Sequence, residues 1–329
     1  MSTSKGTERV RARQMLEIAR RYYLDGESMV SISSQLGVSR FKVARLLNEA
    51  RETGLVTITL NTGGAEDAEL SARLAEHFGL RGALVVEAFG TVEEVRHTVG
   101  AAAGRYLVGT LTPGETLGLT WGRTLTHMIE SLDYLPDCQV LQLTGTVGSN
   151  LRESPIELVR RASLIGGRNA RALMAPLYID NPQAAQALRE QPDIKEVLDL
   201  FATVTTAVVA VGSLQPNPDG VTNSQFLPLL PPAVRERMLN SGAVAEVCGL
   251  LFRPDGTPAD PHLADHVMAI RPEQLRKIPR VIGLASDASK AEAILALWRA
   301  DLISELVVDA DLAETLLAAP AITRDGTIG

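Results

Sequence analysis

The sequence has little cysteine and no long apolar run, and each shortage excludes a class of protein. Only Cys138 and Cys248 occur among the 329 residues, too far apart in sequence to build a CxxC metal site or a disulfide framework. No run approaches the roughly 18 to 20 apolar residues of a membrane-spanning helix. The segment 1–13 is polar and basic and lacks the apolar core of a secretory signal. The sequence therefore predicts a cytoplasmic protein that does not enter a membrane.

Motifs of the common catalytic sites are also missing. The sequence has no GxSxG nucleophile elbow, no Walker loop and no HExxH zinc motif. His262 and His266 form an i,i+4 pair, but a zinc site needs at least a third protein ligand. The neighbouring proline and polar residues favour a surface loop entering a strand over a metal site. We therefore predict no catalytic residue, no metal and no cofactor.

Length and charge predict two unequal domains. A chain of 329 residues exceeds what one core usually organises. The net charge is −7, yet the first sixty residues hold ten Lys or Arg against six Asp or Glu, a surplus of +4 that leaves −11 for the remainder. Such asymmetry is expected when only the basic part contacts a polyanion. We place one domain at 1–60, a linker of small uncharged residues at 61–65 and a second domain at 66–329.

The first domain has the pattern of a helix-turn-helix. Apolar residues recur at helical spacing over 9–24, then from Ser28, and again after Ser39. Between the second and third helices, Gly37 can take the left-handed conformation of a tight turn, and Ser39 is a good N-cap. The segment 56–60 alternates as a short strand, which predicts a wing or a connector.

The third helix is the predicted recognition helix. Its first outward-facing positions would meet base edges or phosphates in the major groove of double-stranded operator DNA; they are Ser39, Arg40, Phe41, Lys42 and Arg45. The alternative is a three-helix packing module with a solvated basic face. Turn chemistry, apolar spacing and charge placement agree in favouring DNA binding.

Beyond residue 65 the sequence predicts an α/β fold with a doubly wound, mostly parallel sheet. Short apolar runs alternate there with amphipathic segments, as expected for strands that are buried on both faces. The expected strands are 83–86, 116–119, 140–143, 207–211, 281–284 and 306–308, and the expected helices include 68–78, 95–108, 183–189 and 290–299. Ligands of such sheets bind at the carboxyl ends of the strands, where loops meet helix N-termini.

The loop 118–124 is the clearest candidate for the ligand site. It follows a predicted strand at Thr120, and Gly122 lets the backbone approach a ligand before Arg123 and Thr124 open a helix. Backbone amides, a hydroxyl and a guanidinium suit a phosphate or a carboxylate. The alternative is an ordinary strand-to-helix turn.

Four further residues extend the predicted pocket. The loop 142–150 contains Gly145 and Thr146 among hydroxyl groups that can bind a polyol, and Lys290 brings positive charge to a helix start. Glu246 lies in an apolar stretch, where a carboxylate is costly unless it is paired or hydrogen-bonded. Glu246 therefore either accepts hydrogen bonds from sugar hydroxyls or forms a structural salt bridge.

The chain resembles the SorC-type family of sugar-responsive bacterial transcriptional regulators. The resemblance covers nearly the whole chain and is carried by LGVSRFKVARLLNEARETGLV, TWGRTL, QLTGTVG, PLYIDNPQ, GAVAEVCGLLF with RPDG, and RVIGLASDASKAEAI. It implies a domain similar in fold to glucosamine-6-phosphate deaminases and ribose-5-phosphate isomerases, kept as a sensor without turnover. It also implies a homotetramer, a dimer of dimers, whose affinity for operator DNA changes when a phosphorylated sugar binds.

The resemblance assigns roles to the residues already singled out. The segment 122–124 would meet the phosphate, Gly145 and Thr146 would line the pocket, Glu246 would bind sugar hydroxyls and Lys290 would complete the charge. The rival hypothesis is a sugar-phosphate isomerase or deaminase with an accessory N-terminal module, with Glu246 as general base. A nucleic-acid scaffold without a ligand ranks last, because it leaves the large α/β domain without a role.

Overall fold

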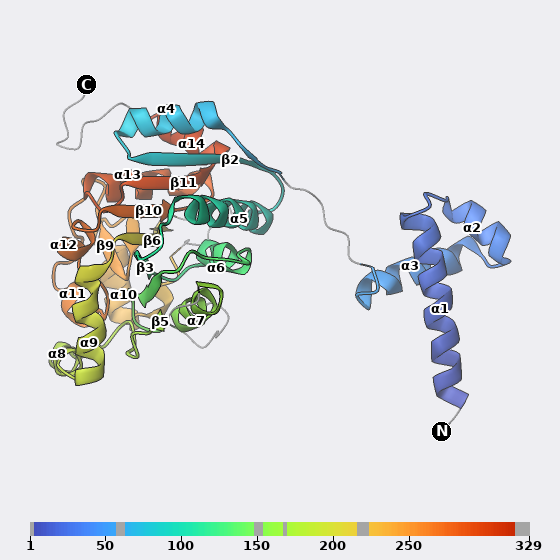
Figure 1. The fold of residues 1–329 in the computed structure, drawn as a ribbon, viewed down its shortest axis with the longest axis horizontal. Helices are drawn as coiled ribbons and strands as arrows, with labels where there is room; N and C mark the ends of the chain where they lie inside the picture. The colour runs from blue at the N-terminus through green and yellow to red at the C-terminus, as the bar shows by residue number, and fades with distance from the viewer. Residues whose placement is uncertain (1–2, 57–62, 148–153, 167–169, 216–223, 320–329) are drawn as a thin grey trace. The chain divides into compact units, whose positions relative to one another are not determined.

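The computed structural model describes residues 3–56, 63–147, 154–166, 170–215 and 224–319 (Figure 1). The chain divides into two compact units, Met1–Asn61 and Thr62–Gly329, and each is described separately below. Nearly all of the predicted strand 56–60 and the end of the loop 142–150 lie outside the described residues. Among the described residues, no helix combines the length and the apolar character needed to cross a membrane.

Three helices make up the described part of the first unit: α1 (Thr3–Tyr23), α2 (Met29–Leu36) and α3 (Arg40–Glu52). The turn between α2 and α3 has the predicted chemistry, since Gly37 is left-handed with φ 62° and the Ser39 hydroxyl accepts from the Lys42 amide at 3.2 Å. Helix α1 begins at Thr3, earlier than the predicted start at residue 9. The first residues of this helix carry no apolar stripe that would signal it in the sequence.

A small core holds the three helices together. Its buried residues come from all three, at the spacing that the sequence predicted: Met15, Ile18, Ala19, Ile32, Val43, Leu46, Leu47 and Ala50. A bidentate pair between Arg11 and Glu49, at 2.9 and 2.6 Å, also joins α1 to α3. The pair is exposed, so the apolar contacts carry most of the stability of this unit.

An eight-stranded sheet organises the second unit, in the order β1-β2-β11-β10-β6-β3-β4-β5. All neighbours are parallel except β1, which is antiparallel to β2. The strands are β1 (Gly63–Glu66), β2 (Gly82–Ala88), β3 (Thr116–Leu119), β4 (Gln139–Gln142), β5 (Ala170–Arg171), β6 (Thr206–Ala210), β10 (Arg280–Leu284) and β11 (Glu305–Asp309). Each of the six predicted strands overlaps one of them.

The predicted linker requires a correction. Residues 63–65 belong to β1 and pair with the edge of the sheet, with Gly63 opposite Ala88. Their small uncharged side chains resemble those of a flexible connection, but backbone hydrogen bonds to β2 define an edge strand whatever its side chains.

Helices cover both faces of the sheet, as a doubly wound fold requires. Figure 1 shows α5 (Val92–Thr110), α6 (Arg123–Glu130) and α7 (Pro155–Gly166) along one face. They pack on Leu84, Val86 and Val208, while Val85 and Val209 point to the opposite core. On that side lie α4 (Ala68–Phe78), α13 (Ala291–Arg299) and α14 (Ala310–Leu317).

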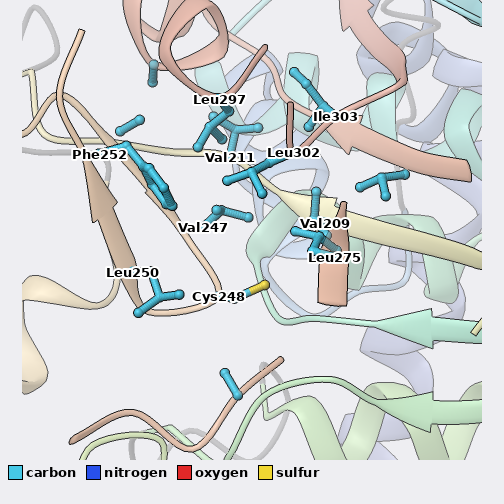
Figure 2. Close-up of a cluster of buried hydrophobic side chains, with 14 of the residues drawn as sticks. Val209, Val211, Val247, Cys248, Leu250, Phe252, Leu275, Leu297, Leu302 and Ile303 are labelled. Carbon is cyan, nitrogen blue, oxygen red and sulfur yellow. The ribbon is translucent and has the colours of Figure 1, made fainter. Parts of the chain in front are cut away.

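A smaller antiparallel sheet extends the second core. It consists of β7 (Gly212–Ser213), β8 (Ala245–Val247) and β9 (Leu250–Phe252). Figure 2 shows side chains from β6, the β8–β9 hairpin and α13 gathered in one buried cluster, among them Val209, Val247 and Leu297. The remaining helices are α8 (Pro182–Arg189), α9 (Pro192–Leu200), α10 (Pro232–Leu239), α11 (Leu263–His266) and α12 (Pro272–Leu275), with 3-10 turns at Phe201–Thr203, Leu227–Leu229 and Ala288–Lys290.

His266 lies on a one-turn helix, α11, whereas His262 lies at the N-cap position in the exposed turn before it. The predicted surface loop therefore includes His262 but not His266. His266 Nδ1 is 3.0 Å from the Ile179 carbonyl oxygen, and its ring stacks on Tyr178. The Asp260 carboxylate accepts a hydrogen bond from the His262 amide at 2.9 Å, within the turn that precedes α11. Within the described parts of the chain, no group of three or more metal-ligating side chains occurs.

The strand order places a crevice between β3 and β6. After β3 the chain proceeds outward to β4 and β5, whereas after β6 it proceeds in the opposite direction to β10 and β11. The connections that leave these two adjacent strands therefore diverge. Ligands of open α/β sheets bind at the carboxyl ends of strands at such a switch point.

Candidate functional site

A cleft of about 370 Å³, part of it open to solvent, lies at this switch point. Its walls come from the first turns of α5 and α6, the end of β6, the strands β7 and β8, and the 3-10 turn before α13. The structure brings five of the predicted residues into one cleft: Gly122, Arg123, Thr124, Glu246 and Lys290. They come from segments that are spread over more than 150 residues of the sequence.

Gly122 is required by the geometry of the turn between β3 and α6. Its φ of 151° is unfavourable for other residues, and a Cβ here would lie 2.6 Å from the Ala210 Cβ on the neighbouring strand. Gly122 also occupies the N-cap of α6 without a capping side chain. The positive end of the α6 dipole thus borders the cleft, where it favours an anion.

Three cationic side chains surround the same cleft. Arg96, Arg123 and Lys290 all line it, and Arg96 and Lys290 are only 6% and 9% exposed. Lys290 Nζ donates to the Val211 carbonyl oxygen at 2.9 Å. Burial, together with the positive charges of Arg96 and Arg123, lowers the pKa of Lys290 to about 8. Two buried cations and a third that is partly buried thus lie around one cleft, and this concentration of positive charge suits an anionic ligand.

Glu246 supplies the negative charge of the cleft. It is 6% exposed, and its Oε1 accepts from the Gly249 amide at 2.9 Å in the β8–β9 turn. Burial raises the pKa of Glu246 to about 7, against the opposing effects of the Gly249 hydrogen bond and the Lys290 charge. Since its hydrogen bond goes to a backbone amide, the carboxylate retains acceptor capacity for ligand hydroxyls.

The residue that lies opposite Glu246 in the neighbouring strand has room only for a glycine. Gly212 pairs with Glu246 across β7 and β8, and a Cβ on it would lie 2.5 Å from Glu246 Oε2. A side chain at 212 would therefore displace the carboxylate from the cleft wall.

Thr120 does not line the cleft. It is 1% exposed, and its hydroxyl accepts from the Ala210 amide at 3.2 Å and lies 3.4 Å from the Val208 carbonyl oxygen. The side chain therefore joins β3 to β6, and contact of Thr120 with the effector stays a prediction.

Gly145 and Thr146 also lie away from this cleft. The Gly145 amide donates to the Met268 carbonyl oxygen and the Thr146 amide to that of Ala175, both at 2.7 Å. A Cβ on Gly145 would lie 2.7 Å from the Ala175 oxygen, so this glycine permits close backbone packing. The sequence shows that a strand ends here, but it does not show that the chain then pairs with the segment 175–177.

The cleft contains residues that sequence reasoning missed, chiefly Arg96, Trp121 and Gln225. Arg96 lies inside a predicted helix, where an arginine is ordinarily solvated. Only the packing of α5 beside α6 reveals that it is buried. Trp121 directly precedes Gly122 in the loop that the sequence had already indicated as the candidate ligand site. Its place in that loop was the signal that could have identified it as a cleft residue.

Helix α3, the predicted recognition helix, presents a basic face with one aromatic side chain. Arg40 and Arg45 are exposed, Lys42 is partly buried, and Phe41 is 85% exposed. The Ser39 hydroxyl is already used by the Lys42 amide, so Ser39 acts first as a helix cap. An exposed phenylalanine between cations suits contact with base edges and phosphates.

Comparison with known proteins identifies the larger unit. Residues 64–318 match a family model described as "Putative sugar-binding domain". The uncharacterised transcriptional regulator YjhU of Escherichia coli is 30% identical over 313 residues, covering 90% of this chain and 92% of YjhU. The sorbitol operon regulator of Klebsiella pneumoniae is 27% identical over 312 residues, covering 93% and 98% of the two chains.

A solved structure shares the fold over both units. The full-length sorbitol operon regulator SorC from Klebsiella pneumoniae matches with a TM-score of 0.69 at 23% identity, covering 93% of this chain and 98% of that one. The family model and the relatives, which extend from the helix-turn-helix to the last helices, show that this chain belongs to the SorC-type family of sugar-binding transcriptional regulators.

Proposed function

We propose that a phosphorylated sugar or polyol occupies the cleft at the switch point and controls the affinity of this regulator for operator DNA. The observation that carries the proposal is the set of three cationic side chains around a cleft at the N-terminus of α6. A phosphate dianion satisfies such a site better than a neutral sugar does, because each guanidinium or ammonium donates a charge-assisted hydrogen bond.

The residues of the cleft divide into two groups in this proposal. The segment 122–124 and Lys290 hold the phosphate, since they combine a helix N-terminus with positive charge. Glu246 accepts hydrogen bonds from sugar hydroxyls on the opposite wall. Trp121 provides an apolar surface against which a sugar ring can pack.

The DNA side of the proposal rests on α3. Arg40, Phe41, Lys42 and Arg45 contact double-stranded DNA in the cytoplasm, and the regulator acts as a homotetramer, a dimer of dimers, on repeated half-sites. Effector control requires that the sugar phosphate bind the DNA-competent and DNA-incompetent assemblies with different affinities. A coupling of about 1 to 3 kcal/mol is typical of such systems.

One observation favours the enzyme alternative. A buried carboxyl with a pKa of about 7 beside a lysine with a pKa of about 8 has the properties of a general acid–base pair. We propose that Glu246 and Lys290 bind the ligand without catalysing, because the relatives of this chain are named transcriptional regulators.

A matched ligand screen tests the proposal. Thermal unfolding is followed with sugar phosphates and, in parallel, with the same sugars lacking phosphate, and each mixture is then analysed for turnover. We expect phosphorylated ligands alone to raise the Tm, because only the bound state is stabilised, and we expect them to be recovered unchanged. Equal stabilisation by the unphosphorylated sugars would contradict the phosphate site, and consumption of a ligand would establish the enzyme.

A further inference from the structure

Arg96 is a cleft residue on α5, and it already has a negative partner. Its guanidinium pairs with Glu93 one turn earlier on the same helix. The two side chains differ in environment, since that of Arg96 is 7% exposed and that of Glu93 is 62% exposed. A partly solvated carboxylate holds a guanidinium weakly, so an anion inside the cleft can compete for it.

Glu93 has a second partner that can retain it. Its Oε1 lies 2.8 Å from Nε2 of His127 on the neighbouring helix α6. When Arg96 turns to another anion, the Glu93 carboxylate therefore keeps a hydrogen bond. Arg96 and Lys290 line the same cleft, so one anionic group inside it can contact both cations.

The same helix contacts the first strand of the unit. Arg105 Nη2 donates to the Gly64 carbonyl oxygen at 3.4 Å and lies 3.8 Å from the Glu66 carboxylate. Thr98 Cγ2 lies 3.5 Å from the position of a Cβ on Gly64. β1 is the point at which the chain coming from the DNA-binding unit enters the sheet. Helix α5 thus touches both the cleft and the strand that connects to the DNA-binding unit.

We propose that Arg96 binds the anionic group of the effector by exchanging Glu93 for it, and that α5 transmits this exchange to β1. The inference rests on the proposed function, since it needs an anionic ligand in the cleft. Two further steps belong to this proposal: Glu93 keeps only its contact with His127, and α5 moves relative to Gly64. Binding of a ligand in the cleft then changes β1, the strand that connects to the helix-turn-helix.

The test compares Arg96→Gln with a matched control in the full-length chain. Arg160→Gln is the control, because Arg160 also pairs with a glutamate three residues earlier, Glu157, but on α7 and outside the cleft lining. The probes are inorganic phosphate and glucose 6-phosphate. Binding is measured by thermal shift, and amide hydrogen exchange of the peptide containing residues 63–66 reports on β1.

In the wild-type and control proteins we expect both probes to raise the Tm and to change exchange in 63–66 by about fivefold or more, the lower range of allosteric coupling. In Arg96→Gln we expect the apparent Kd for phosphate to rise about tenfold, the loss of one charge-assisted contact. At ligand concentrations that restore occupancy, exchange in 63–66 should stay at its ligand-free rate. An unchanged Kd for phosphate together with an intact β1 response in Arg96→Gln would overturn this inference and leave the proposed function standing.

A second variant tests the exchange itself. Glu93→Gln removes the competing negative charge and keeps the shape of the side chain, so phosphate should bind roughly fivefold more tightly. Unchanged or weaker binding in this variant overturns the exchange. If the wild-type protein itself shows no response to either probe, the anionic effector of the proposed function fails as well, and the two failures are therefore distinguishable.

Discussion

At the scale of single residues, Lys290 is the side chain whose position is hardest to explain without a ligand. Its ammonium is buried, its pKa falls to about 8, and its described hydrogen bond goes to one carbonyl oxygen. A lysine maintained at such a cost is expected where function requires the charge. Replacement of Lys290 should therefore affect the stability of the fold and the affinity for the anion in different ways.

Lys290→Met should abolish anion binding without destabilising the ligand-free fold. The lowered pKa corresponds to a cost of roughly 3 kcal/mol for the buried charge, and the lost bond to the Val211 oxygen offsets about 1 to 3 kcal/mol of that gain. We expect the free energy of unfolding to stay constant or rise by up to about 2 kcal/mol in urea titrations. A marked loss of stability would instead assign Lys290 a structural role.

The lowered pKa of Lys290 also predicts how phosphate affinity depends on pH. As pH rises through about 8, the lysine of the free protein loses its charge, so affinity should fall, by up to about tenfold per pH unit. Ionisation of Glu246 near pH 7 acts in the same direction. Calorimetric titrations from pH 6 to 9 measure this, and a flat profile through pH 8 would be inconsistent with Lys290 as a ligand contact.

At the scale of elements, the β3–α6 turn depends on one glycine. Gly122→Ala places a Cβ against Ala210 and forces an unfavourable φ, so we expect a loss of roughly 2 kcal/mol of unfolding free energy together with weaker phosphate binding. Gly109→Ala is the control, because it lies in α5 with open space around it. The control should gain about 0.5 to 1 kcal/mol. Equal behaviour of the two variants in urea denaturation would argue against a special role for the turn.

The recognition helix α3 makes a separate prediction. Arg40→Ala should weaken binding to operator duplexes and lower the slope of log affinity against log salt by about 1, as expected for one lost phosphate contact. Lys195→Ala, which removes an equal charge from α9 of the other unit, should leave the slope unchanged. Fluorescence anisotropy at several salt concentrations compares them, and a full slope in Arg40→Ala would exclude this arginine as a phosphate contact.

The elements also show how far sequence reasoning reached. The predicted strands are apolar on both faces, and such apolar runs predict buried strands from the sequence alone. β1 and β5 were missed because they are short edge strands defined by backbone pairing. Arg96 was missed because helix packing, which no local pattern encodes, buries it. The sequence did not reveal that Gly145 and Thr146 lie apart from this cleft, because the chain after β4 pairs there with Met268 and with the segment 175–177.

At the scale of the whole molecule, the chain holds a basic DNA-binding unit and an acidic sensor unit that shares the fold of SorC-type regulators. The function requires that ligand binding in the sensor unit change DNA binding by the other unit, although each unit has its own core. The contacts of α5 with both the cleft and β1 provide a physical route within the sensor unit. The remainder of the coupling depends on the assembled regulator.

The most direct test of this account is the affinity of the full-length protein for an operator duplex, selected from a random pool, with and without a saturating sugar phosphate. We expect the sugar phosphate to change the operator Kd by about fivefold or more, the unphosphorylated sugar to leave it unchanged, and Lys290→Met to respond to neither. A sugar phosphate that binds the wild-type protein but leaves operator affinity constant would contradict the central claim that this cleft controls DNA binding.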